Sequence, residues 1–346
     1  MNGRPHVTLE DVAGVASVSL ATASRVLNGT TNVREDLRER VLSAAADLAY
    51  APNVHAQALA GATRNTVGVI CHDVADPAFA AVARGVMRVA SDNGLLVMLA
   101  STFHDPDKEI AYVSELRAQR ASAIVLIGSG FQDRHWEKAL SAELDVYRRG
   151  GGRVAAVSRH QGVKVDTVQP ENRAGAKELA AAMLRLGHRR FAVLAGPREL
   201  TTSLDRLTGF REGLAEGGAE LTDRDVFAAP FTRDGGYEAA SALLSAGHKA
   251  TCVLAVSDVM AIGALSAFRA AGRSVPADVS LAGFDDISVT RDLNPSLSTV
   301  ALPLEKLGEQ AMELALSGNS GNRAKVRRIA GEVVLRDSTA KPRRRR

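Results

Sequence analysis

The sequence lacks the runs and motifs that mark several large classes of protein. No apolar stretch approaches the roughly 18 to 20 residues that cross a bilayer, and the N-terminus has no apolar secretory core, so we predict a cytoplasmic protein without membrane contact. Cys71 and Cys252 lie far apart in apolar runs without CxxC spacing, which predicts buried thiols. No GxGxxG, GxxxxGK(S/T) or HExxH motif is present, and the glycines at 128 and 130 lack the further glycine of a phosphate loop. We therefore expect that the protein is not an enzyme and that it binds no metal or cofactor.

Positive charge is also scarcer than the net value suggests. The formal net charge is +4, but Lys341 and Arg343–Arg346 supply five cations, leaving 38 basic against 39 acidic residues. Residues 1–66 hold six arginines, no lysine and six acidic residues. Net charge therefore does not identify a nucleic-acid binder, and such a prediction must depend on where single residues lie. The tail 341–346 is predicted to be a solvated end, with nonspecific attraction to phosphate as the alternative.

Three short helices are predicted in the first 50 residues. Thr8 and Asp11 have capping-box spacing, Ser19 can cap a second helix, and Asn28 with the following glycine ends that helix. The apolar spacing predicts helices over residues 9–16, 20–27 and 35–49. Arg34 occupies the position where a capping side chain is expected, so the third helix loses the stability that a cap would give. Glu35 and Asp36 offset part of this loss of stability through the helix dipole. Residues 53–65 hold about two helical turns, which are marginal alone, so we expect a hinge that orders when docked.

Strands alternate with amphipathic helices from residue 66 onward. This order is typical of doubly wound parallel sheets, and the chain is long enough for two of them. We predict an α/β unit over 66–340 with two lobes, and a ligand cleft between them at the carboxyl ends of the strands. The predicted N-lobe comprises residues 66–160 and 291–322, and the predicted C-lobe comprises residues 161–290 and 323–340.

Motifs along the whole chain resemble the LacI/GalR (lactose-repressor/galactose-repressor) family of bacterial regulators. They include VTLEDVA at 7–13, VSLATASRVLN at 18–28, YAPN at 50–53, LGHRR at 186–190, VPADVS at 275–280, GFDD at 283–286 and NPSLSTV at 294–300. The resemblance implies a small all-α helix-turn-helix headpiece over 1–52, a hinge over 53–65 and sensor lobes with a periplasmic-binding-protein-like fold.

The headpiece residues fit this resemblance when the second helix lies in the major groove. Leu20 and Ala21 then face base edges and Arg25 can reach a guanine, although a solvated helix arginine is the commoner reading for Arg25 alone. Ser19, Thr22 and Ser24 can bond phosphates. The resemblance implies that Leu59 wedges into the minor groove, with core packing as the alternative. Further DNA contacts are expected from the resemblance at Thr8, Asn28, Asn32, Tyr50, Asn53 and Ala56, and Arg34 is a candidate phosphate contact.

The sensor lobes are expected to bind a sugar-like molecule through carboxylates, guanidiniums and aromatic faces. The positions that match the family's cleft are Phe79, Ser158, Arg159, Asn172, Arg206, Phe231, Asp258 and Asp285. The two phenylalanines could instead be core residues, and Asp258 could be a helix N-cap.

We therefore predict a homodimeric repressor of carbohydrate-metabolism genes that binds a pseudo-palindromic operator and is released by a sugar-like effector. The sequence near the C-terminus contains no apolar heptad repeat, so we expect no tetramerising coiled coil. The alternative is a cytoplasmic sugar-binding protein whose head binds something other than DNA.

Overall fold

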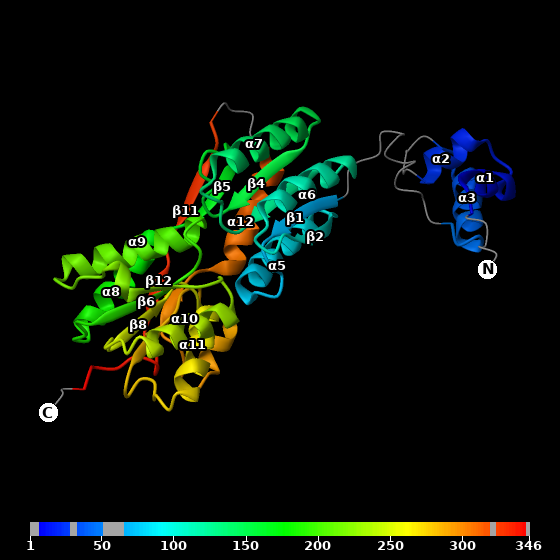
Figure 1. Cartoon of the computed structure of the whole chain (residues 1–346). Helices are drawn as coiled ribbons and strands as arrows, with labels where there is room; N and C mark the ends of the chain where they lie inside the picture. The colour runs from blue at the N-terminus through cyan, green and yellow to red at the C-terminus, as the bar shows by residue number, and fades with distance from the viewer. Residues whose placement is uncertain (1–6, 28–32, 51–65, 319–322, 344–346) are drawn as a thin grey trace. The chain divides into compact units, whose positions relative to one another are not determined.

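The structure, a computed structural model, describes residues 7–27, 33–50, 66–318 and 323–343. The chain divides into two units, Met1–Arg64 and Asn65–Arg346, which Figure 1 shows in blue and in cyan to red. Across the described ranges, no helix is both long and apolar enough to cross a membrane. The predicted hinge lies outside the described residues, as do Asn28, Asn32, Asn53, Ala56 and Leu59.

Three helices around a small apolar core form the described part of the first unit. They are α1 (Leu9–Ala16), α2 (Leu20–Leu27) and α3 (Glu35–Asp47). Val12, Ala23 and Val41, one from each helix, are fully buried. The predicted three-helix headpiece is confirmed.

The caps of these helices follow the sequence closely. The backbone N–H of Asp11 donates to Oγ1 of Thr8 at 3.3 Å, and the N–H of Thr8 donates to the Asp11 carboxylate at 2.8 Å, which completes the predicted capping box. Ser19 accepts from the N–H of Thr22 at 3.2 Å. Helix α3 ends two residues earlier than predicted because Ala49 is left-handed (φ 49°), and the N–H of Tyr50 turns back to the carbonyl of Ala45.

The first lobe of the second unit is a six-stranded parallel sheet with helices on both faces (Figure 1). Side chains alternate along β1: Val67 and Val69 face α5 and α12, whereas Ile70 faces α6 and α7. The strands, in sheet order, are β11 (Val326–Ile329), β5 (Asp166–Pro170), β4 (Arg153–Val157), β3 (Ala123–Ile127), β1 (Thr66–Cys71) and β2 (Leu96–Ser101). The helices are α5 (Pro77–Asp92), α6 (Pro106–Ala118), α7 (Arg134–Arg149) and α12 (Leu304–Ser317).

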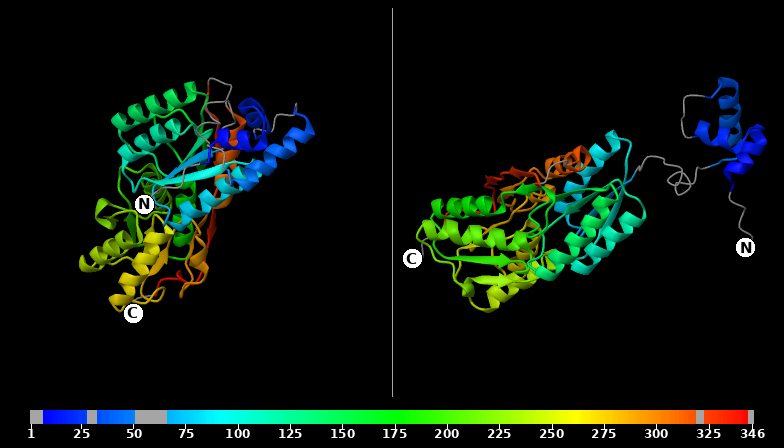
Figure 2. Two further views of the ribbon diagram at one scale, coloured as in Figure 1. Left: turned by 90° about the vertical axis from the view of Figure 1, so that its right-hand side faces the viewer. Right: turned by 90° about the horizontal axis from the view of Figure 1, so that it is seen from above.

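The second lobe has its own four-stranded parallel sheet and core, and Figure 2 shows the two sheets in separate lobes. Helices α8 and α9 pack on each other, as do α10 and α11. The strands are β7 (Val226–Ala228), β6 (Phe191–Ala195), β8 (Cys252–Ala255) and β9 (Ser280–Ala282), beside a small antiparallel pair, β10 (Thr299–Ala301) and β12 (Glu332–Val334). The helices are α8 (Asn172–Arg185), α9 (Thr201–Glu216), α10 (Arg233–Ser245) and α11 (Asp258–Ala270). The predicted two doubly wound lobes are confirmed.

The predicted lobe boundaries are wrong at three places. Strand β5 pairs with β4, and β11 pairs with β5, so both belong to the first lobe rather than to 161–290 and 323–340. Strand β10 was expected in the first lobe, within 291–322, but it pairs with β12, and its Val300 lies in the second core. The chain therefore crosses between the lobes after β5, after β10 and after β11.

Glycines set how closely pairs of helices approach in both lobes. A Cβ on Gly308 of α12 would overlap the carbonyl oxygen of Val82 in α5, and a Cβ on Gly85 of α5 would overlap the carbonyl of Glu305 in α12. Gly236 and Gly263 have the same reciprocal relation between α10 and α11. A side chain at these positions must push two backbones apart.

We expect Gly308→Ala to lower the free energy of unfolding by about 1–3 kcal/mol, because overpacking outweighs the better helix propensity of alanine. Urea denaturation of the full-length protein measures this difference. Gly150→Ala is the control: Gly150 has an ordinary φ of −78°, and its nearest neighbour would lie 3.3 Å from the new Cβ. Equal effects of the two substitutions would contradict the packing argument.

Candidate functional site

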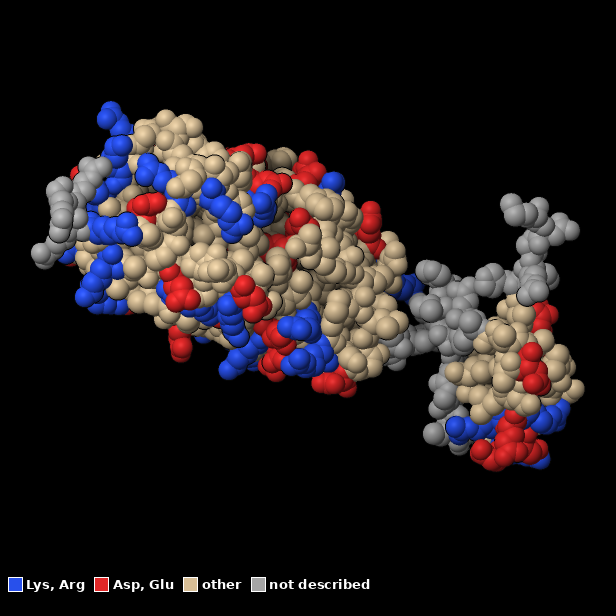
Figure 3. Space-filling view, turned by 90° about the horizontal axis from the view of Figure 1, so that it is seen from below, with Lys and Arg blue, Asp and Glu red and all other residues tan. Residues whose placement is uncertain are grey.

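Helix α2 presents one exposed face that matches the predicted DNA-contacting residues. Leu20 is 46% exposed although it is apolar, and Ala21 and Arg25 are also exposed. Thr22 and Ser24 are half-buried beside them. Because Ala23 and Val26 point into the core, the helix cannot rotate this face inward. Figure 3 shows basic and acidic side chains next to each other on the displayed face of the headpiece, in keeping with its balanced charge.

The other described headpiece candidates have structural contacts of their own. Thr8 and Ser19 hold the starts of α1 and α2 as described above. Arg34 precedes α3 without a side-chain cap bond, and its guanidinium binds Asp36 through Nε at 3.1 Å and Nη2 at 2.9 Å. Tyr50 is half-buried against the headpiece core. Arg34 is exposed, so it can exchange Asp36 for a phosphate, but Tyr50 can offer only part of its side chain.

A cleft lies between the two lobes of the second unit, and side chains from both lobes leave only about 50 Å³ of free volume in it. The predicted residues that line it are Phe79 and Ser158 from the first lobe and Arg206, Phe231 and Asp285 from the second. These side chains follow the carboxyl ends of strands or lie on the helices and loops beyond them, as the topology of parallel sheets requires. Five of the eight predicted cleft residues therefore line this one cleft.

Arg206 and Asp285 form a buried ion pair in the lining of this cleft. The guanidinium donates to the carboxylate through Nη2 at 2.7 Å and Nη1 at 3.2 Å, and both residues are less than a tenth exposed. Nε of Arg206 donates to Oδ1 of Asn172 at 3.0 Å, and its guanidinium carbon lies 3.9 Å from the ring centroid of Phe284. Burial raises the pKa of Asp285, and the Arg206 charge opposes that shift.

Three predicted cleft residues lie behind or beside the walls. Asn172 orients Arg206 and is itself buried. Arg159 pairs with Asp205 at 2.7 Å and opens onto a neighbouring surface depression. Asp258 is completely buried away from the cleft-lining set, so the structure gives it a supporting position.

Asp258 is not the N-cap of α11, contrary to the alternative raised from the sequence. The cap is Ser257, whose Oγ accepts from the N–H of Met260 at 3.3 Å. The Asp258 carboxylate instead accepts from Thr299 Oγ1 at 2.7 Å and from the N–H of Ile287 at 3.0 Å. Burial raises the pKa of Asp258 to about 7, and Asp285 adds to the shift. The residue ties the loop after β9 to β10.

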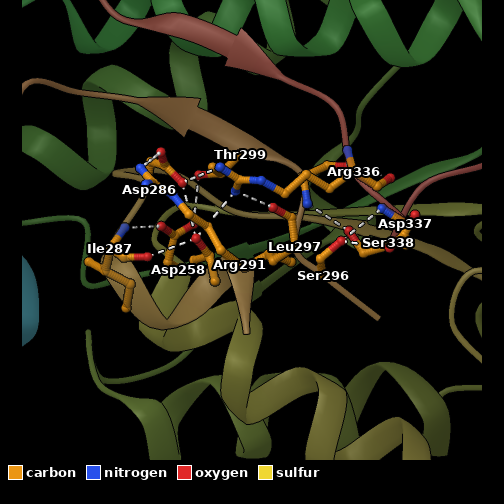
Figure 4. A network of polar contacts seen from close by, with 12 residues as sticks. Asp258, Asp286, Ile287, Arg291, Ser296, Leu297, Thr299, Arg336, Asp337 and Ser338 are labelled. Carbon is orange, nitrogen blue, oxygen red and sulfur yellow. Dashed lines mark hydrogen bonds and ion pairs between the residues drawn. The ribbon is translucent and has the colours of Figure 1, made fainter. Parts of the chain in front are cut away.

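The same loop carries Asp285 in a strained conformation. Asp285 and Asp286 have φ values of 118° and 57°, which non-glycine residues seldom adopt. Asp286 is held by Arg336 at 2.7 Å and by Arg291 at 2.9 Å, as Figure 4 shows together with the contact between Thr299 and Asp258. This network fixes the loop, so Asp285 faces Arg206 in a prearranged geometry.

Sequence reasoning missed several polar residues that line the cleft: His72, Asp76, His104, Ser129 and Thr202. A signal for three of them exists. His72 directly follows β1, His104 lies three residues after β2, and Ser129 lies two residues after β3, and the carboxyl ends of parallel strands face the cleft.

The imidazole of His72 is neutral and held by two partners. Burial lowers its pKa to about 3. Its Nε2–H donates to the carbonyl of Ser129 at 2.9 Å, which leaves Nδ1 to accept from the hydroxyl of Thr102 at 3.3 Å. The ring of His104 stacks on it at a centroid distance of 4.5 Å. Among the described residues, no group of three or more His, Cys, Asp and Glu could hold a metal ion.

Two family descriptions match the chain. "Bacterial regulatory proteins, lacI family" covers residues 8–53, and "Periplasmic binding protein-like domain" covers residues 180–339. The HTH-type transcriptional regulator DegA of Bacillus subtilis (strain 168) is 31% identical over 96% of this chain and 98% of its own length. The HTH-type transcriptional regulator GalR of Escherichia coli (strain K12) is 34% identical over 90% of this chain and 88% of its own length. These relatives are transcription regulators rather than enzymes.

Solved structures resemble the chain over almost its whole length. The CelR–cellobiose complex has a TM-score of 0.71 and 30% identity, and the match covers 97% of this chain and 100% of that one. The lac repressor dimer bound to operator and an anti-inducer has a TM-score of 0.83 and 25% identity, over 96% of this chain and 99% of that one.

Proposed function

The chain belongs to the lacI family of bacterial regulatory proteins, and on that premise we propose that it represses carbohydrate-metabolism genes until a small sugar-like effector releases it from operator DNA. A regulator of this kind works in the cytoplasm, where bacterial DNA lies. The observation that carries the proposal is the cleft, which is lined by the Arg206–Asp285 ion pair and by the aromatic side chains Phe79 and Phe231. Charged groups that bind hydroxyls beside apolar faces are the composition that a sugar requires.

DNA recognition is assigned to the exposed face of α2. Leu20 and Ala21 are suited to thymine methyl groups, and Arg25 is suited to a guanine edge. Thr22 and Ser24 lie where they can bond the phosphates on either side. The contacts predicted for Asn28, Asn32, Asn53, Ala56 and Leu59 remain predictions of the sequence.

Release is assigned to closure of the cleft. Phe79 and Ser158 belong to one lobe and Arg206 and Asp285 to the other, so a molecule that bonds to both walls favours the state in which they lie closest. An effector shifts DNA affinity only by its preference for that state.

Gel-shift titration on DNA from upstream of the gene tests this function. We expect binding that weakens steeply with salt and that weakens further when a sugar of the correct structure is added. Binding to no such fragment would contradict the repressor assignment, and tighter binding with the sugar would make the effector a co-repressor.

A homodimer is supported by an apolar surface on the first lobe. Strand β2 is an edge strand, and Leu96 on it is 72% exposed and Leu99 38% exposed. Phe103, just after β2, is 64% exposed, and Met87 of the adjacent helix α5 is 41% exposed. Exposed apolar side chains along an unpaired strand edge mark an association surface, and a second copy would present two headpieces to a two-fold symmetric operator.

We expect Leu96→Glu to convert the dimer into a monomer at micromolar concentration, because it places a charge at the most exposed apolar side chain of this surface. Sedimentation velocity measures the change in mass. Leu335→Glu is the control, because Leu335 is 47% exposed and directly follows β12 of the second lobe, outside this surface. A dimer that survives Leu96→Glu would assign the interface elsewhere.

A further inference from the structure

The charges that line the cleft are few, and they do not favour an anion. Among the described lining residues, the only cationic side chain is that of Arg206, whereas Asp76 and Asp285 are both carboxylates. The imidazole of His72 is neutral because burial lowers its pKa to about 3, and burial also lowers the pKa of His104. The cleft thus carries one positive and two negative groups.

The single cation is already used by the protein. Arg206 donates through Nε to Asn172, through Nη1 to the carbonyl of Val256 at 2.6 Å and to Asp285, and through Nη2 to Asp285. Four of its five N–H groups therefore have protein acceptors. Its charge is balanced by Asp285, so a phosphate could gain Arg206 only by displacing a buried carboxylate.

One helix N-terminus beside the cleft, that of α5, is occupied by a side chain of the protein. Asp76 caps α5, and its Oδ1 accepts from the N–H of Ala78 at 2.9 Å. The N-terminus of a helix is a common site for a bound anion, but here the carboxylate of Asp76 occupies it. Burial raises the pKa of Asp76 to about 6, so the group is ionised above that pH.

One polar atom of the cleft has no partner within the described residues. Nε2 of His104 is shielded from solvent and makes no hydrogen bond there. A buried polar atom of this kind is costly to leave unsatisfied, and a hydroxyl group, which both donates and accepts, can satisfy either tautomer of the ring. Asp76 can accept a hydroxyl proton but repels an anion.

We propose that the cleft selects an uncharged polyhydroxy effector and excludes its phosphorylated counterpart, with Asp76 and His104 as the selecting side chains. This inference rests on the proposed sensor function and narrows it. Hydroxyl groups can bond to Asp76, to His104 and to the fifth N–H of Arg206, whereas a phosphoryl group would enter a site whose remaining charge is negative.

Matched pairs of probes test this selection on the full-length protein. Thermal shift and calorimetry would be run with ribose against ribose 5-phosphate, galactose against galactose 6-phosphate, and cellobiose, at about pH 8 so that Asp76 is ionised. We expect at least one neutral sugar to bind, and its phosphate to bind about tenfold or more weakly. A phosphate that binds as tightly as its sugar overturns this inference alone, whereas a panel without any binding contradicts the sensor function as well.

Two variants separate the selecting groups from the fold. Asp76→Asn keeps a cap for α5 but removes the charge, so we expect weaker binding of the neutral sugar and a smaller preference over its phosphate. His104→Ala should weaken the neutral sugar about tenfold through the lost hydrogen bond. His135→Ala, an exposed histidine on α7, is the control and should bind as the parent protein does. Unchanged sugar affinity in both Asp76→Asn and His104→Ala would overturn the assignment.

Discussion

Arg206→Ala is expected to lower the free energy of unfolding by about 3–5 kcal/mol and to abolish the effector response. The cause is Asp285, which is 6% exposed and would lose Arg206, its only cationic partner among the described residues, at 2.7 Å. Asn172, which accepts from Nε of the same guanidinium, would also lose a hydrogen bond. Urea denaturation monitored by circular dichroism measures the loss, and a thermal-shift titration with a bound sugar measures the response.

The loss should depend on pH in a definite direction. Burial already raises the pKa of Asp285 above its ordinary 3.8, and removal of Arg206 removes the charge that opposes this shift. A carboxyl group with a raised pKa in the folded state binds more protons there than in the unfolded state, so stability falls as pH rises above 3.8. The difference in the free energy of unfolding between the parent protein and Arg206→Ala should therefore grow from acidic to neutral pH.

Two further variants separate the ion pair from the loss of one side chain. The double substitution Arg206→Met with Asp285→Asn removes both charges of the pair, and asparagine tolerates the positive φ of position 285 better than an aliphatic residue does. It should recover part of the lost stability without recovering the effector response. Arg173→Ala removes an exposed arginine that pairs with Glu212 on the surface, and it should change stability little. If Arg206→Ala were as mild as Arg173→Ala, Asp285 would not depend on Arg206 in the folded state.

The architecture followed from the sequence where the signals are local. The capping box of Thr8 and Asp11 involves residues three apart, and the alternation of strands with helices repeats over segments of similar length. The lobe boundaries did not follow, because they depend on which sheet receives β5, β10 and β11. Strands of three to five residues carry no local information about their partners: Thr167 pairs with Ala156 in β4, and Val326 pairs with Thr167 from a distant part of the chain.

The sequence allowed single residues of the site to be selected by their type, but it did not show which of them contact each other. Arg206 and Asp285 could be selected because they lie near Gly-rich turns, yet the sequence does not reveal that they neutralise each other across 79 residues. Asp258 resembled a cap because it starts a helix, but the neighbouring Ser257 takes that position and the carboxylate turns inward. His72 and His104 each follow a predicted strand, but the sequence does not give the sheet order, and only that order brings the two rings together.

Arg25→Ala is expected to weaken binding to the operator by about tenfold to a hundredfold while leaving binding to unrelated DNA nearly unchanged. A bidentate contact between arginine and guanine contributes about 1–3 kcal/mol of discrimination, and it adds little to nonspecific affinity. The structure supports a base contact because Arg25 is exposed on the same face of α2 as Leu20 and Ala21, whose apolar side chains offer the bases no hydrogen bonds. We therefore expect Arg25 to be the main source of direct recognition on this helix.

The specificity ratio distinguishes this contact from a general loss of charge. Fluorescence anisotropy on operator and scrambled duplexes, each over a salt series, gives both affinities for Arg25→Ala and for Arg38→Ala, which removes an exposed arginine of α3. Arg38→Ala should leave the ratio of the two affinities unchanged, even where loss of a phosphate contact lowers both and reduces the salt dependence. If Arg25→Ala also lowers both affinities equally, Arg25 contacts phosphate, and recognition by α2 then depends on the methyl contacts of Leu20 and Ala21 and on the shape of the DNA.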